Sequence, residues 1–440
     1  MYVRVFLFSI LFLMLAACAP QVVPTVTVAP MPSATPVIET PAAVSKDFDA
    51  ARALEHARKL AVDIGARVAG TPSASSAADY IANEFEKSGL QVTRQKFSFE
   101  GWQDNGTTVQ LLVPETKNLE AQALQYSPGG TIEGEIVLVP GVGARQDFSQ
   151  VNVREKIALV KRGTLPFSDK AANAEEAGAR AIIIYNDKPQ MFTGTLRERV
   201  HIPVIALSGA TGETLLKILE NGAAQARIAS DTGIVQRTGT NIIGTLRGKS
   251  DETVVLGGHY DSVSADPGAG DNASGTAVLL ELARVMGAKP QPQNSLVFIA
   301  FDAEELGLYG SRAYVDGLSN QQLEQMRGML NFDMLGAGSG PLLLMGDGKL
   351  ALLARASAKQ LEIDARNGSL PANAGSDHES FARRGVDTVF FMRDYNLLHT
   401  PQDTIDQINQ TYLEEAGRVA QRVLERLETT GKQTQGAVAE

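Results

Sequence analysis

The run Thr253-Val-Val-Leu-Gly-Gly-His259 is a continuous apolar stretch that ends in an imidazole. Such a run, without polar alternation, is typical of a strand buried on both faces of a parallel sheet. Ser295-Leu-Val-Phe-Ile-Ala-Phe301 has the same form and leads into Asp302-Ala303-Glu304-Glu305, and a third apolar segment ends at Asn331-Phe332-Asp333. Ligands bind at the carboxyl edge of open α/β sheets, so these strand ends predict one site of carboxylates and imidazole.

Helical patterns at 273–286 and 410–427 alternate with these strands. The alternation predicts an α/β fold, a mostly parallel mixed sheet with helices on both faces. The same domain is expected to begin upstream, because residues 50–87 carry two helical patterns separated by Gly70-Thr-Pro72 and residues 90–99 alternate like a strand.

A different composition follows from about Leu119 to Ser230, where short apolar runs alternate with Gly-rich turns. Examples are Gly134-Glu-Ile-Val-Leu-Val139 and Ala181-Ile-Ile-Ile-Tyr-Asn186, with one helical pattern over 167–178. The larger domain is therefore expected to be interrupted by a small β-rich domain.

Six side chains follow apolar segments and together have the chemistry of a metal-dependent hydrolase: His259, Asp271, Glu304, Glu305, Asp333 and His399. Zinc takes about four ligands from His, Asp, Glu or Cys, and the one cysteine, Cys18, lies near the N-terminus, so a zinc site must use nitrogen and oxygen. Two ions about 3.5–4 Å apart need a bridging carboxylate, for which Asp271 is the natural candidate. Adjacent residues leaving a strand point in different directions, so we assign Glu305 to metal and Glu304 to proton transfer rather than to a solvated helix face.

The chain resembles the co-catalytic zinc aminopeptidase and glutamate carboxypeptidase-like superfamily in six blocks that occur in family order. The blocks are His259-Tyr-Asp261, Gly268-Ala-Gly-Asp-Asn-Ala-Ser-Gly275, Ala303-Glu-Glu-Leu-Gly-Leu-Tyr-Gly-Ser311, Asn331-Phe-Asp-Met-Leu-Gly336, Gly375-Ser-Asp-His-Glu-Ser-Phe381 and His399-Thr-Pro-Gln-Asp-Thr404. The resemblance covers roughly the C-terminal half and implies a zinc-exopeptidase fold.

The resemblance also implies a role for each residue of the site. His259 and Asp333 would bind one Zn²⁺, Glu305 and His399 the other, and Asp271 both, giving two Zn²⁺ per chain. Glu304 would be the general base. Asp261 would orient an imidazole as a supporting carboxylate, and the Asp271-Asn272 peptide would be cis.

The expected substrate pocket is less well defined. Asp377 and His378 lie within one of the six blocks and are expected in the pocket wall, although His378 could instead cap a helix. The family often has Tyr before the final His, where this chain has Leu398. Tyr395 is a possible replacement for that tyrosine.

The interrupting domain resembles a protease-associated domain through Arg162-Gly163, Pro166-Phe167 and Ile202-Pro203-Val204. Two roles are open for it: covering the cleft or selecting substrates, or serving as a structural spacer.

The N-terminus has the form of an export signal. Met1-Tyr-Val-Arg4 precedes an apolar run from Val5 to Ala17 that is too short for a membrane span. Leu15-Ala-Ala-Cys18 resembles a bacterial lipobox, so Cys18 is the expected lipidation site. An outward-facing, lipid-anchored protein of the cell envelope is expected, with a secreted protein as the alternative.

The expected organisation has six parts. These are a signal peptide with the lipidated cysteine (1–18), a disordered Pro/Thr/Ala-rich tether (19–45), the first part of the catalytic domain (46–118), the inserted domain (119–230), the second part of the catalytic domain (231–432) and a flexible tail (433–440). The formal charge of −10 and pI near 5.2 argue against nucleic acid as a partner.

The expected function is a zinc-dependent exopeptidase acting on peptides, and an aminopeptidase is favoured. The alternatives are a carboxypeptidase, for which Arg393 could bind a carboxylate, a dipeptidase, or a glutaminyl cyclase with one zinc. A surface-anchored binding protein without activity is disfavoured because all six site positions are filled.

Overall fold

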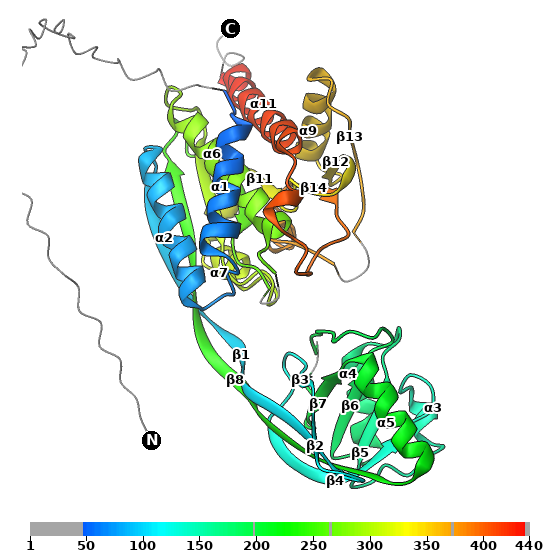
Figure 1. The fold of residues 1–440 in the computed structure, drawn as a ribbon. Helices are drawn as coiled ribbons and strands as arrows, with labels where there is room; N and C mark the ends of the chain where they lie inside the picture. Colours follow the sequence, from blue (N-terminus) through cyan, green and yellow to red (C-terminus); the bar gives the residue numbers. More distant parts are fainter. Residues whose placement is uncertain (1–46, 197–198, 264–265, 371–373, 436–440) are drawn as a thin grey trace, which may run out of the picture. The chain divides into compact units, whose positions relative to one another are not determined.

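The computed structural model describes residues 47–196, 199–263, 266–370 and 374–435 (Figure 1). The expected signal peptide, Cys18 and the tether lie outside these residues. The larger domain contains a mixed sheet with strand order β13-β12-β14-β11-β9-β10-β8. Its strands are β8 (Ala224–Leu246), β9 (Thr253–His259), β10 (Ser295–Phe301), β11 (Met326–Phe332), β12 (Ser339–Met345), β13 (Ala365–Arg366) and β14 (Thr388–Asp394).

Strand β9 lies in the middle of this sheet, with β10 and β11 parallel to it on either side. Its bounds, and those of β10, are the ones that the apolar runs predicted. The register pairs His259 with Phe301 and Gly257 with Asn331. Asp333, two residues beyond Asn331, is therefore level with His259, so the residues after all three strands meet at one edge.

Helices cover both faces of the sheet, which confirms the predicted fold class. One face carries α1 (Ala50–Arg58), η1 (Lys59–Ile64), α2 (Pro72–Lys87), α6 (Ser274–Gly287), α9 (Lys349–Gln360) and α11 (Gln410–Gln435). The other face carries α7 (Tyr309–Asp316), α8 (Asn320–Glu324) and α10 (His378–Ala382). The alternation within β9 follows from this arrangement: Val254 and Leu256 pack in the core of the first face, Val255 in that of the second.

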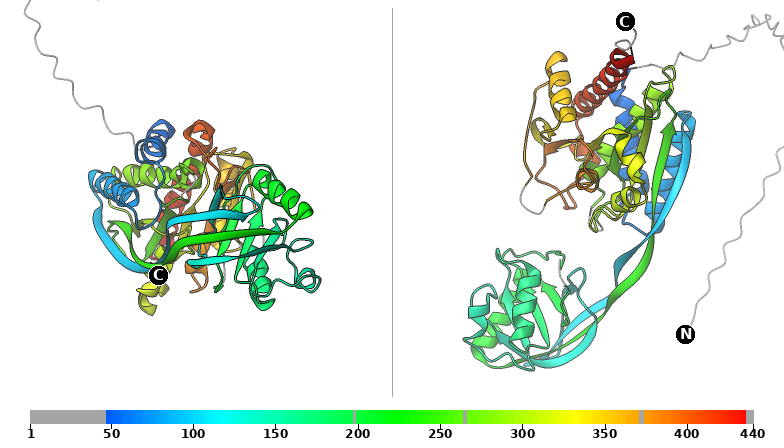
Figure 2. Two further views of the ribbon diagram at one scale, coloured as in Figure 1. Left: turned by 60° about the horizontal axis from the view of Figure 1, so that its bottom comes forward. Right: turned by 180° about the vertical axis from the view of Figure 1, so that it is seen from behind.

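The smaller domain is reached through β8 and β1 (Gln91–Val113), which pair antiparallel from Gln91–Thr245 to Val113–Gln225 (Figures 1 and 2). Its sheet continues from β8 in the order β8-β4-β5-β6-β7-β3. Its elements are β2 (Lys117–Leu119), β3 (Ala121–Ala123), β4 (Gly130–Leu138), α3 (Arg145–Phe148), β5 (Ile157–Lys161), α4 (Phe167–Glu176), β6 (Ala181–Tyr185), β7 (Val204–Leu207) and α5 (Gly209–Asn221).

Helices α4 and α5 pack on opposite faces of the smaller sheet, because Ala171 belongs to one apolar cluster and Leu215 to another. Strand β1 is much longer than the strand predicted at 90–99. Its middle part is mostly exposed or half-buried, so no buried face imposes an alternating pattern on it.

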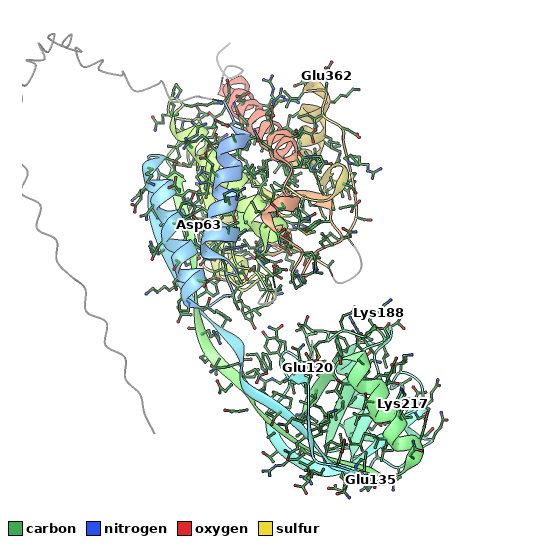
Figure 3. All side chains as sticks on the ribbon, viewed as in Figure 1. Asp63, Glu120, Glu135, Lys188, Lys217 and Glu362 are labelled. Atoms are coloured by element: carbon green, nitrogen blue, oxygen red, sulfur yellow. The ribbon has the colours of Figure 1, made fainter. Side chains whose placement is uncertain are left out.

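Charged side chains cover the outside of both domains (Figure 3). Asp63 and Glu362 are exposed on the larger domain, and Glu135, Lys188 and Lys217 on the smaller one. Among the described residues, no helix is long and apolar enough to cross a membrane.

Candidate metal centre

The five expected metal ligands come together at the carboxyl edge of the larger sheet. His259 Nε2 lies 3.2 Å from Asp271 Oδ1 and 3.3 Å from Asp333 Oδ1. His399 Nε2 lies 3.2 Å from Asp271 Oδ2 and 3.0 Å from Glu305 Oε2. Each oxygen of Asp271 thus faces a different imidazole.

These separations suit zinc. Four ligands at about 2.0–2.2 Å in a tetrahedron are about 3.3–3.6 Å from one another, close to the distances across the cluster. Two sets of potential metal donors have ligand atoms within 4.8 Å: His259 with Asp271 and Glu305, and His259 with Glu304 and Asp333. Glu305 Oε1 is buried with no hydrogen-bond partner among the described residues. The donor set therefore fits metal ions that share Asp271.

The imidazole of His259 is fixed in one tautomer. Its Nδ1 lies 3.2 Å from the carbonyl oxygen of Asp261, which can only accept, so Nδ1 carries the proton. Nε2 is then the ring nitrogen that would coordinate a metal ion held beside Asp271 and Asp333.

Asp261 supports the Glu304–Glu305 segment more directly than it supports the imidazole. Its Oδ1 accepts a hydrogen bond from the backbone N–H of Glu304 (3.0 Å) and its Oδ2 one from that of Glu305 (3.3 Å). The carboxylate lies 3.5 Å from His259 Nδ1. One fully buried carboxylate therefore orients the backbone that carries both glutamates.

Asp271 is held in position through backbone hydrogen bonds. The N–H groups of Gly270 and Asp271 donate to the two oxygens of Asp403 at 2.7 and 3.0 Å. The Asp271–Asn272 peptide is cis, as the resemblance implied. Asn272 donates to the carbonyl oxygen of Phe332 (2.9 Å), which ties Asp271 to the segment that carries Asp333.

Asp333 is supported from a separate block. Ser376 donates to Asp333 Oδ2 (2.8 Å) and lies 2.8 Å from Asn331 Nδ2, which donates to it. Gly258 permits the close approach of β9 to the backbone just before Asp333, because a Cβ there would lie 2.6 Å from the carbonyl oxygen of Phe332.

Three non-glycine residues at the site have positive φ: Ala303 (58°), Met334 (56°) and His399 (58°). Ala303 precedes Glu304, Met334 follows Asp333 and His399 is itself an expected ligand. Such conformations cost about 1–3 kcal/mol each and persist where surrounding structure imposes them. These strained backbone conformations lower the stability of the fold, and they set the directions in which Glu304, Asp333 and His399 leave the backbone.

The protonation equilibria reflect a surplus of buried carboxylates. Burial lowers the pKa of His399, but hydrogen bonds to Asp271 and Glu305 outweigh it and raise the pKa to about 11. Burial, and then the charge of Asp271, raises the pKa of Glu305 to about 8. Burial likewise raises the pKa of Glu304 well above its usual range. Divalent cations would compensate the same charge and displace these protons.

Apolar side chains line the cavity beside the cluster. Within the larger domain, Met334, Leu370, Phe390, Met392 and Leu398 form this wall. Phe390 and Met392 belong to a small apolar cluster against which Met334 and Leu370 pack.

Tyr395 also lines this cavity, but its hydroxyl donates to Asp403 Oδ1 (2.8 Å). The contact with Asp403 weighs against Tyr395 as a free donor to a reacting oxygen, so that role stays a prediction. Leu398 lines the cavity beside His399, where the family often has tyrosine.

Asp377 and His378 do not line the cavity among the described residues. Both lie behind the apolar wall. Asp377 is fully buried, and its side chain makes no capping bond to α10. His378 stacks on Phe390 with ring centroids 4.6 Å apart. Burial lowers the pKa of His378 to about 4, so a neutral ring supports the wall from behind.

Arg393 points away from the site. It is 1% exposed, forms an ion pair with Glu415 and lies 3.9 Å from the ring centroid of Tyr412. It is therefore not available to bind the carboxylate of a peptide, which removes the residue that kept a carboxypeptidase open.

Sequence reasoning missed several supporting residues. Arg67 is fully buried and donates to the carbonyl oxygens of Tyr260 (2.7 Å), Pro267 (2.7 Å) and Gly268 (2.8 Å), so it holds the segment between His259 and Asp271. Asp403 and Ser376 lie within two of the six blocks, which was the available signal. Arg67 lies in none of them, and the partners of all three residues lie far away in sequence.

Imidazoles and a shared carboxylate at a sheet edge, beside a further buried glutamate, define a metal-dependent hydrolase. The chain belongs to peptidase family M28. The profile described as Peptidase family M28 matches residues 241–424, and that of the PA domain matches residues 107–215. The expected superfamily and the inserted protease-associated domain are thereby confirmed.

Similar proteins narrow the activity. Aminopeptidase YwaD of Bacillus subtilis (strain 168) is 34% identical over 392 residues, covering 84% of this chain and 83% of that protein. The probable lipoprotein aminopeptidase LpqL of Mycobacterium tuberculosis is 34% identical over 303 residues, 66% of this chain and 59% of the relative. The structure of BSAP, a zinc aminopeptidase from Bacillus subtilis, has a TM-score of 0.78 at 31% identity, covering 87% of this chain and 96% of that one.

The protein is therefore a zinc-dependent aminopeptidase, as predicted. The comparisons favour neither a carboxypeptidase nor a dipeptidase, a glutaminyl cyclase or an inactive binding protein.

Proposed function

We propose that the enzyme removes N-terminal residues at a centre of two zinc ions, with Glu304 as the general base. One observation carries the proposal: the two oxygens of Asp271 each lie 3.2 Å from a different imidazole, His259 on one side and His399 on the other. A single ion would not require one carboxylate to face two separate imidazoles in this way.

The bound ions would acidify a water and polarise the scissile carbonyl. His259, Asp333 and Asp271 would hold one ion, and His399, Glu305 and Asp271 the other. Glu304 follows Ala303 and precedes Glu305 in the chain, and its carboxylate lies within 4.8 Å of the possible ligand atoms of His259 and Asp333. Glu304 would accept a proton from water and return it to the departing amine. Burial raises the pKa of Glu304, and a carboxylate with a raised pKa is a stronger proton acceptor.

The apolar wall supports a preference for a large apolar N-terminal side chain. Phe390 and Met392 form an apolar cluster against which Met334 packs, and a charged side chain buried against this cluster would lose its hydration without gaining a partner there. Full burial of a leucine, methionine or phenylalanine side chain of the substrate would instead favour binding by about 1.5–3 kcal/mol.

We also propose that the chain is exported and lipid-anchored through Cys18. The sequence around Cys18 supports this, as does the similarity to LpqL, whose name describes a lipoprotein.

The test of function uses the purified full chain, peptides with free and blocked N-termini, and a chelator. We expect cleavage of free-amino peptides only, with leucine preferred over lysine and aspartate, loss of activity with chelator, and recovery that saturates at two zinc ions per chain. Recovery at one equivalent would contradict the two-zinc centre. Cleavage of blocked peptides would contradict the exopeptidase.

Glu304→Gln tests the base. General base catalysis contributes about 10²–10⁴-fold, so kcat should fall by that factor while zinc content stays at the wild-type value. Near-normal turnover in a zinc-loaded Glu304→Gln enzyme would show that the proton is accepted elsewhere.

A further inference from the structure

The strand that carries the inserted domain ends its pairing with β10 beside the catalytic loop. Strand β8 pairs with β10 from Leu246–Leu296 to Ile242–Ala300. The segment that follows β10 runs from Asp302 through the first two residues of α7, Tyr309 and Gly310, and contains Glu304 and Glu305. This segment is called the catalytic loop. Asn241 is the residue of β8 next after Ile242 toward the inserted domain.

The side chain of Asn241 is bonded at both ends of this loop. Its Oδ1 accepts from the N–H of Asp302 (3.1 Å), and its Nδ2 donates to the carbonyl oxygen of Gly310 (2.8 Å). The second Nδ2 proton goes to Gln95 Oε1 on β1 (2.9 Å). Asn241 thus joins the start and the end of the loop to β8 and β1.

The neighbouring residue of β8 adds two contacts. The N–H of Thr240 donates to Asp302 Oδ2 (2.9 Å). The carbonyl oxygen of Thr240 accepts from the hydroxyl of Tyr260 (2.9 Å), the residue that follows His259. Strand β8 is therefore hydrogen-bonded to the segments that carry His259, Glu304 and Glu305.

The Asn241 side chain is a polar group in a buried position, where an apolar side chain would serve for packing alone. Asn241 is 0% exposed, and a buried amide that loses its partners is destabilising, whereas an apolar residue of the same shape needs none. Asn241 makes two hydrogen bonds to the catalytic loop and one to β1. Such a buried network fixes the loop in a single geometry.

We propose that Asn241 is a positioning residue for Glu304 and Glu305, which joins the catalytic loop to the ribbon of β1 and β8. The proposal rests on the proposed function, in which the loop supplies the base and a metal ligand. Asn241 acts through the backbone at Asp302 and Gly310 and does not line the cavity. Since both strands of the ribbon continue into the inserted domain, the same contacts couple the loop to that domain's attachment.

Asn241→Leu tests the proposal, with Asn294→Leu as the matched control. Asn294 is also 0% exposed and directly precedes β10, at the end opposite the catalytic loop. For each variant, kcat, KM, bound zinc and melting temperature are measured on the full chain. Gln95→Leu is a milder variant at a half-exposed position that deletes one acceptor of Asn241 and leaves Asn241 in place.

We expect Asn241→Leu to lower kcat about 10–100-fold in zinc-loaded protein, the range typical of residues that orient metal ligands. KM should change much less, and Gln95→Leu should show a smaller loss of kcat in the same direction. Asn294→Leu changes a buried amide far from the catalytic loop and should leave kcat unchanged.

Wild-type kcat in folded Asn241→Leu would overturn the proposal. If that variant does not fold, wild-type kcat in Gln95→Leu overturns it, as would an equal loss of kcat in Asn294→Leu. Glu304→Gln separates the two ideas. An active Glu304→Gln enzyme would refute the proposed base, whereas an inactive one beside fully active Asn241→Leu would refute only the positioning role.

Discussion

Asp261→Asn is the most informative single change near the metal centre. The carboxylate accepts from the N–H groups of both Glu304 and Glu305, and asparagine has the same shape with only one acceptor oxygen. Its NH₂ group would face one of the two N–H donors and leave it buried and unpaired. Metal ligands themselves are unchanged.

The magnitude follows from the lost bond. A hydrogen bond to a charged group contributes about 1.5–3 kcal/mol, and about 1.4 kcal/mol corresponds to a factor of ten. Loss of one such bond at the backbone of Glu304 or Glu305, the proposed base and metal ligand, should therefore lower kcat/KM about 10–100-fold. The assay is hydrolysis of a leucine peptide by protein reconstituted with zinc, with bound zinc measured on the same sample.

Asp147→Asn in the inserted domain is the matched control. Asp147 is also buried, and its Oδ2 accepts from the N–H groups of Val142 (3.1 Å) and Ala144 (2.9 Å). We expect a loss of stability in that domain with unchanged kcat/KM. The reasoning is refuted if zinc-loaded Asp261→Asn keeps activity within about twofold of wild type, or if both variants lose activity equally.

Two further predictions concern stability and location. Burial lowers the pKa of His56, which contacts Tyr80, to about 4 from its ordinary 6.5. Because the unfolded chain binds a proton that the folded chain does not, stability is full above pH 6.5 and declines as the pH falls toward 4. Urea unfolding should therefore show a loss of about 2 kcal/mol between pH 7.5 and pH 5 from this residue. His56→Gln should reduce the pH dependence by that amount, and an unchanged pH dependence would be contrary to it. Cys18→Ala should move the protein from the membrane fraction to the soluble fraction of its host, and unchanged fractionation would exclude lipidation at Cys18.

Much of the fold was predictable because burial on both faces leaves a strong local signal. The apolar runs gave β9 and β10 their observed bounds, and the parallel register then follows from helices between strands. Strand β1 was predicted too short, because a ribbon with two exposed faces needs no alternating pattern. Its length depends on pairing with β8, which is more than a hundred residues away in sequence.

The residues that form the site were predictable from the sequence, whereas most of the hydrogen bonds that hold them in place were not. The five donors were found from strand ends and motif order, and the structure brings them together. The contact of Asp261 with the Glu304 and Glu305 backbone, and the contact of Ser376 with Asp333, depend on how loops fold back. Arg393 could equally have faced the cavity or α11, and the pairing with Glu415 was decided by the packing of that helix into the core on the first face of the sheet.

The sequence by itself determined which residue types end the buried strands, and thereby the chemistry of the site, because solvation and side-chain period act over a few residues. Only the tertiary structure decided how far apart the two imidazoles lie, which oxygen of Asp271 each one faces, and that Asn241 bonds both ends of the catalytic loop. Those distances are set by strand register and by backbone N–H and carbonyl groups that every residue carries, so no local pattern records them.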